Sequence, residues 1–218
     1  MGQMRDHGAI KIPKGYGRIT FSRTEIINIL IAVAALTVAF TITFLGGFRG
    51  LMSANLVDAL ESLAISFIAV LSGFMLHELA HKFMAQRSGA WAEFRAQPSG
   101  LLMGIVFSFL GLIFALPGAV YIQGMISRKQ NGLISLAGPA TNLALGAVFI
   151  ALYLVTGGTL LRTAFYIIGS VNFLLAAFNL LPIPPLDGSK VLKWNVPVYI
   201  AAFGAALVMA ALIFTRTL

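Results

Sequence analysis

The chain has 218 residues, a net charge of +8 and no cysteine; 59% of its residues are hydrophobic and only 10% are charged. A soluble domain of this length needs more charge on its surface, so the composition indicates a membrane protein without a separate soluble domain. The basic residues lie at the ends of apolar stretches, as topology signals do, so nucleic acid is not an expected partner. The absence of cysteine excludes disulfides and thiolate metal ligands.

Residues 1–24 form a polar, basic and glycine-rich segment ahead of the first apolar stretch. The segment has neither the apolar core nor the small-residue cleavage site of a secretory signal. We therefore expect it to be a cytoplasmic tail that can contact anionic headgroups. Residues 25–218 are expected to form one membrane domain.

Apolar stretches long enough to cross a bilayer follow one another along the rest of the chain. They span residues 26–45, 56–85, 133–155, 160–181 and 196–214. A shorter apolar stretch, residues 101–116, ends at Pro117-Gly118, and residues 119–122 have strand character. The predicted fold is an all-α polytopic membrane protein with about five to six transmembrane helices and a short re-entrant or β-strand segment.

The topology depends on whether residues 101–116 cross the membrane or enter it and return. With a cytoplasmic N-terminus, a re-entrant segment places twelve of the fifteen Lys and Arg residues on the cytoplasmic side. A crossing segment places only ten there, because Lys190 and Lys193 move outside. The positive charge of cytoplasmic loops favours the re-entrant arrangement. Irregular backbone at membrane depth must lie against protein or water, so a polar cavity or packed helices are expected nearby.

Residues 77–81 read His-Glu-Leu-Ala-His inside an apolar stretch that is expected to be helical. Positions i and i+4 lie on one helix face, so His77 and His81 can bind one metal ion. Glu78 lies about 100° around the helix and can act as a general base on a water at the metal without being a ligand. Chance and a structural histidine pair are the alternatives, but ionisable groups inside a membrane are costly and functional by default.

A catalytic zinc usually has three protein ligands, so one more ligand is expected. His7 and the acids Asp6, Glu25, Asp58, Glu61 and Glu93 lie in the tail, at helix ends or in a loop. Asp187 instead follows three prolines between residues 182 and 185, which should unwind the end of a membrane helix. Asp187 is therefore the candidate third ligand of one Zn²⁺, with an ordinary turn as the alternative. Only the re-entrant arrangement brings it to the histidines' side of the membrane.

The motif at residues 77–81, followed by Leu186-Asp187-Gly188 within residues 179–188, resembles the site-2 protease family of intramembrane metalloproteases. Residues 137–142, Ala-Gly-Pro-Ala-Thr-Asn, are similar to the segment that opens the next core helix in that family. The resemblance implies a three-helix catalytic core at about residues 56–190 and cleavage of membrane-spanning substrates. It also implies that His77, His81 and Asp187 are the zinc ligands and that Glu78 is the base.

Other positions follow from the same resemblance. Asn179 matches a family asparagine that helps to bind substrate or the oxyanion, with a helix-packing hydrogen bond as the alternative. Asn142 is expected to have a structural role as a helix cap. Members of the family have short membrane-associated strands in the region that corresponds to residues 113–122. These residues are therefore predicted to form an edge strand to which an unwound substrate adds. The inserted peptide-binding domain and the nucleotide-binding pair of better-known members are not expected here.

Two other functions stay open from the sequence. A membrane metallohydrolase acting on a lipid or a terminal peptide would use the same zinc chemistry in a different pocket. A metal transporter or an inactive binding protein is disfavoured, because transport needs ionisable groups along a whole path and because Glu78 is present. The predicted function is intramembrane zinc proteolysis in the cell membrane, with the bilayer and transmembrane proteins as partners.

Overall fold

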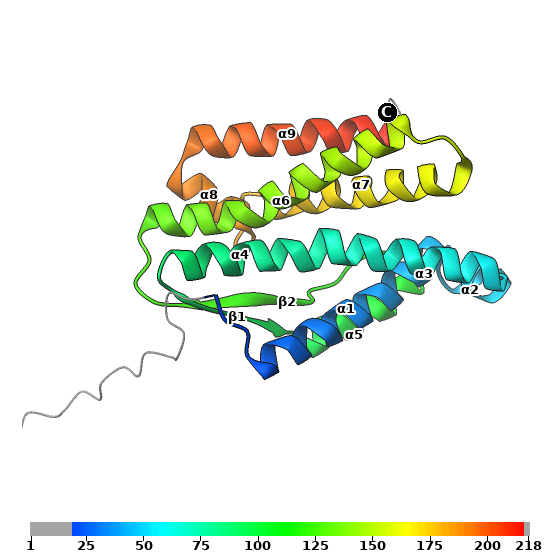
Figure 1. Ribbon diagram of the computed structural model, residues 1–218, viewed down its shortest axis with the longest axis horizontal. Coiled ribbons are helices and arrows are strands. Elements are labelled where there is room, and N and C mark those ends of the chain that lie inside the picture. Colours follow the sequence, from blue (N-terminus) through cyan, green and yellow to red (C-terminus); the bar gives the residue numbers. More distant parts are fainter. Residues whose placement is uncertain (1–18, 216–218) are drawn as a thin grey trace, which may run out of the picture.

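The computed structural model describes residues 19–215, so the tail prediction and His7 lie outside the described residues, apart from residues 19–24. The elements are α1 (Arg23–Phe44), α2 (Gly47–Ser53), α3 (Leu56–Val70), the π-helical turn η1 (Leu71–Met75), α4 (Leu76–Arg87), β1 (Trp91–Ala96), α5 (Pro98–Ser108), β2 (Gly118–Gln123), α6 (Arg128–Val155), α7 (Thr159–Asn179), α8 (Asp187–Trp194) and α9 (Val196–Phe214). Figure 1 shows the long helices side by side, with the small sheet near one end of the bundle.

Within the described residues, five helical segments are long and apolar enough to cross a membrane. They are α1, the continuous segment from α3 through α4, α6, α7 and α9. Large apolar side chains such as Leu30, Ile200 and Val208 remain exposed on these helices, as expected where lipid surrounds the protein. The chain is thus a mostly helical, multi-pass membrane protein, as predicted.

The start of α6 differs from the prediction because of a local cap. The Ser127 hydroxyl accepts a hydrogen bond from the Gln130 N–H, and the Gln130 side chain accepts one from the Ser127 N–H. This capping box satisfies two of the free amides at a helix start. The helix therefore begins at Arg128, five residues earlier than the apolar pattern indicates.

Residues 97–117 leave the sheet and return to it, so they do not cross the membrane. Helix α5 runs alongside α1 (Figure 1), and the Phe109 carbonyl accepts a hydrogen bond from Phe48 just beyond α1. Residues 112–117 then form an extended returning segment over α5. A Cβ on Gly100 of α5 would lie 2.0 Å from the Leu116 carbonyl oxygen of this segment. At the base, the Gln97 N–H donates to the Pro117 carbonyl over 2.9 Å. Both ends of the excursion therefore lie at the same level.

The sheet has two antiparallel strands, of which the sequence predicted only one. β2 is shorter than predicted, because residues 113–117 belong to the returning segment. β1 contains Glu93, which was expected to lie in a loop. Its alternation of Ala92 and Phe94, both 1% exposed, with Glu93 and Arg95 is a weak strand signal that charged residues obscure.

A buried ion pair fixes this sheet to two membrane helices. Glu25 of α1 accepts a hydrogen bond from the Lys82 ammonium of α4 over 2.7 Å and another from the Phe94 N–H over 3.0 Å. Lys82 also donates to the Ala92 carbonyl over 3.0 Å. Both charged side chains are fully enclosed, with 0–1% of their surface exposed. The pair therefore ties the outer edge of β1 to α1 and α4.

Candidate metal centre

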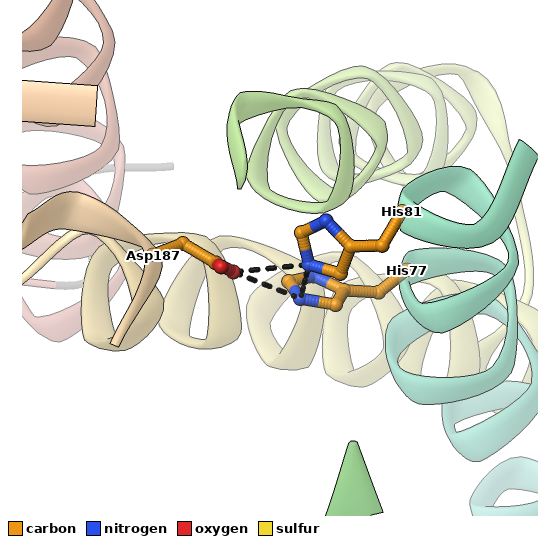
Figure 2. A group of neighbouring side chains, drawn as sticks. All are labelled: His77, His81 and Asp187. Carbon is orange, nitrogen blue, oxygen red and sulfur yellow. Dashed lines mark hydrogen bonds and ion pairs between the residues drawn. The ribbon is translucent and has the colours of Figure 1, made fainter. Parts of the chain in front are cut away.

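The histidines and the aspartate of the predicted site come from elements distant in the sequence. His77 and His81 lie one turn apart on α4 and point toward Asp187, the first residue of α8 (Figure 2). Helix α7 ends at Asn179, and the proline-containing segment that follows reverses into α8. Gly188 makes this close approach possible, since a Cβ there would lie 2.0 Å from the Leu180 carbonyl oxygen.

The three side chains bring together, in a buried position, atoms that can donate electron pairs to a metal ion. The two Nε2 atoms lie 2.9 Å apart, and Asp187 Oδ2 lies 3.0 Å from His81 Nε2 and 3.5 Å from His77 Nε2. Zinc with bonds of about 2.0–2.1 Å in tetrahedral geometry separates its ligand atoms by about 3.3 Å. All three residues are at most 9% exposed. The spacing and the atom types thus suit a divalent metal ion.

Hydrogen bonds on the far sides of the rings set the histidine tautomers. His81 Nδ1 lies 2.7 Å from the Ile134 carbonyl, which can only accept, so this nitrogen carries the proton. His77 Nδ1 lies 2.5 Å from the side-chain oxygen of Asn142. Both Nε2 atoms then carry lone pairs directed at the Asp187 carboxylate, and a cation between them satisfies all three acceptors.

Asn142 does not have the predicted capping role. It lies in the middle of α6, which begins at Arg128 and continues through Pro139. Its side chain is fully buried and contacts His77 rather than a helix terminus. The capping interpretation failed because the pair Gly138-Pro139 resembles a helix start, whereas tertiary packing maintains the helix through it.

The charge environment favours an ionised Asp187. Lys190, one turn along α8, places its ammonium 3.6 Å from Asp187 Oδ1. The second carboxylate oxygen, Oδ2, is the one that faces the histidines.

Gly138 leaves the space in which the ligand atoms converge. A Cβ at this position would lie 2.5 Å from His81 Nε2 and 2.6 Å from His77 Nε2. No side chain larger than hydrogen can occupy the position without moving the imidazoles. The sequence predicts no separate function for Gly138, which is part of the segment that resembles the family's helix start.

A cavity of about 340 Å³ opens onto this cluster. Glu78 and Asn179 line it together with the three clustered residues, the returning segment and β2. The backbone N–H of Val120 lies near the Glu78 carboxylate. The Asn179 amide nitrogen donates one N–H to the Leu175 carbonyl over 3.0 Å, and its second N–H has no hydrogen-bond partner among the described residues.

Strand β2 lines this cavity, whereas the outer edge of β1 faces α1 and α4. On β1, the N–H groups of Phe94 and Ala96 point away from β2 and are taken by Glu25 and Asn28. In an antiparallel pair, the residue opposite such a position also directs its N–H and C=O outward. Val120 lies opposite Phe94, so its backbone groups point to the free edge of β2 and toward Glu78.

The fold and the site thus define a multi-pass membrane protein with a buried His-His-Asp cluster beside a glutamate. Residues 158–211 match the model of peptidase family M50. Two of the relatives that carry the name "Putative zinc metalloprotease" show the extent of the match. One, MJ0611 of Methanocaldococcus jannaschii, is 44% identical over 182 residues, covering 80% of this chain and 86% of that protein. The other, YwhC of Bacillus subtilis, is 31% identical over 152 residues, covering 60% of this chain and 68% of that protein.

A further relative, the zinc metalloprotease MJ0392 of Methanocaldococcus jannaschii, is 27% identical over 136 residues, or 60% of this chain and 34% of that protein. No solved structure matches the chain significantly. The chain belongs to peptidase family M50, the site-2 protease family of metalloproteases. The family resemblance seen in the sequence is therefore confirmed.

Proposed function

We propose that this protein is an intramembrane zinc protease that hydrolyses peptide bonds in or near transmembrane segments of other proteins. The observation that carries the proposal is the convergence of three buried acceptor atoms, from His77, His81 and Asp187, beside Glu78 in one cavity. The cluster lies among helices long enough to cross a membrane. The names of the relatives support zinc as the metal.

His77, His81 and Asp187 would hold one Zn²⁺ through two nitrogens and one oxygen, with a position left for water or substrate. When bound, zinc lowers the pKa of a coordinated water to about 7 and polarises a carbonyl. The backbone and side-chain partners of the imidazoles select the neutral tautomer whose Nε2 lone pair can bind a metal.

Glu78 is the proposed general base. Its carboxylate takes a proton from the attacking water and passes it to the amide nitrogen of the leaving peptide. Its place beside the cluster, rather than within it, suits a proton carrier better than a ligand. Asn179 is the proposed substrate or oxyanion contact, because its second N–H can donate to a carbonyl oxygen as negative charge develops there.

The free edge of β2 is the proposed place for the substrate backbone. A peptide bond inside a helix is shielded by the helix's own hydrogen bonds, so the substrate must unwind before it is cut. Outward-facing backbone groups at Val120 can pair with the unwound substrate strand. This pairing would bring the substrate strand next to Glu78. Glu25 and Asn28 occupy the outer edge of β1, so the strand cannot add there.

We also propose that the metal end of the bundle faces the cytoplasm and that the protein resides in the cell membrane. That end carries Arg23, Arg87, Arg95, Arg128, Lys129, Lys190 and Lys193, whereas Arg49 and Arg162 lie at the other end of the described chain. Because the chain has no cysteine, single substitutions Met52→Cys and Met125→Cys give clean labels for opposite ends. A membrane-impermeant maleimide should label Met52→Cys on intact cells and Met125→Cys only after permeabilisation; the reverse result would refute this orientation.

The proposed activity is tested by incubating tagged transmembrane substrates with wild type, with Glu78→Gln and with a chelator. Wild type should cleave, Glu78→Gln should bind one zinc per chain and lose about 10²- to 10⁴-fold in rate, and the chelator should stop cleavage reversibly. Mass analysis of the products separates an internal cut from removal of a terminal residue or hydrolysis of lipid. A Glu78→Gln variant that cleaves at the wild-type rate would refute the assignment.

A further inference from the structure

Behind His77, on the side away from the cavity, lies a chain of buried amides that joins three membrane helices. Asn142 of α6 places its oxygen at His77 Nδ1 and donates from its nitrogen to the Gly73 carbonyl over 2.8 Å. The same nitrogen donates to the Asn172 oxygen over 3.0 Å. Asn172 of α7 in turn donates to the Ser72 hydroxyl and to the Ile168 carbonyl.

The direction of each amide in this chain is determined by its partners. The Ile168 carbonyl can only accept, so the Asn172 nitrogen must face it and the Asn172 oxygen must face Asn142. The Asn142 nitrogen then faces that oxygen and the Gly73 carbonyl. The Asn142 oxygen is left for His77, whose Nδ1 must therefore be the donor.

Such a network is unusual inside an apolar bundle. Both asparagines are 0% exposed, and an unsatisfied polar group at membrane depth would destabilise the fold strongly. Gly73 and Ser72 belong to η1, the π-helical turn that directly precedes the helix carrying the histidines. Such turns occur frequently at functional sites. The network thus joins the backbone before His77 to α6 and α7.

We propose that Asn142 and Asn172 are positioning residues that hold His77 in its metal-binding tautomer and orientation, with Asn172 acting through Asn142. This inference rests on the proposed function, because it takes His77 to be a metal ligand. His81 has a direct backbone carbonyl for the same purpose, whereas His77 depends on two side chains. Groups that orient ligating histidines typically contribute about 10- to 100-fold to metal affinity or activity.

The test measures zinc affinity by competition with a chromophoric chelator, for the full-length protein in detergent. Asn142→Leu should weaken zinc binding by about 10- to 100-fold, and Asn172→Leu should weaken it less, because the Gly73 carbonyl still orients Asn142. The double variant should bind no more weakly than Asn142→Leu alone, since the two act in series. Ser170→Ala, which removes a partly buried hydrogen bond to the Tyr166 carbonyl on the same helix as Asn172, should bind zinc like wild type.

A spectroscopic readout distinguishes positioning from loss of fold. The visible absorption of the Co²⁺-loaded protein reports ligand geometry, and Asn172→Leu should change it while Ser170→Ala leaves it unchanged. Asn172→Leu keeps the contact between Asn142 and His77, so it remains informative if Asn142→Leu does not fold. Wild-type affinity and an unchanged Co²⁺ spectrum in Asn172→Leu would overturn the inference, as would independent, multiplying losses in the double variant. If wild type itself binds no zinc, the proposed function fails and the inference fails with it.

Discussion

Replacing Gly138 with alanine should damage the metal centre through one methyl group. The added carbon would lie 2.5 Å from His81 Nε2 and 2.6 Å from His77 Nε2, whereas carbon makes unstrained contacts at about 3.5 Å. The rings must therefore move by up to about 1 Å, and such overpacking costs about 1–3 kcal/mol. If this cost falls on the metal-bound state, zinc affinity drops roughly 5- to 150-fold.

The assay is zinc competition with a chelator, alongside thermal unfolding in detergent. Gly146→Ala is the matched control, because it lies on the same helix and its Cβ would meet the Phe173 ring at 2.9 Å, away from the histidines. The control should lower thermal stability and leave zinc affinity unchanged. Wild-type zinc affinity in Gly138→Ala would show that the ligand atoms do not converge beside this glycine.

Three other outcomes are expected. Val120→Pro removes an N–H that faces the free edge of β2 and leaves the ladder to β1 intact, so it should reduce cleavage of transmembrane substrates more than Val120→Ala does, at equal zinc content; equal rates would refute substrate pairing there. Lys82→Met leaves Glu25 as an unpaired buried charge and should lower the free energy of unfolding by about 3–5 kcal/mol, more than Lys82→Met combined with Glu25→Gln, as chemical denaturation would measure. Chelation should lower the unfolding temperature of wild type but not of His81→Ala, and an equal effect on both would place the metal elsewhere.

The amino-acid sequence by itself determined the membrane class, the five apolar spans and the two motifs. Composition and the length of apolar runs carry these features, because a bilayer demands about 20 apolar residues per helix. Spacing of four residues also places His77 and His81 on one helix face. The excess of Lys and Arg favoured a re-entrant segment, and the meeting of Gln97 with Pro117 confirms that the chain returns.

Only the tertiary structure decided what surrounds these motifs. Strand β1 exists because Glu25, Asn28 and Lys82 satisfy its outer edge, and those side chains are up to 69 residues away in the sequence. Asn142, which was expected to cap a helix, contacts His77 instead, because α6 continues through Pro139. Local patterns predict helices and ligand types, whereas hydrogen-bond partners at membrane depth depend on which helices pack together, and no local spacing encodes that.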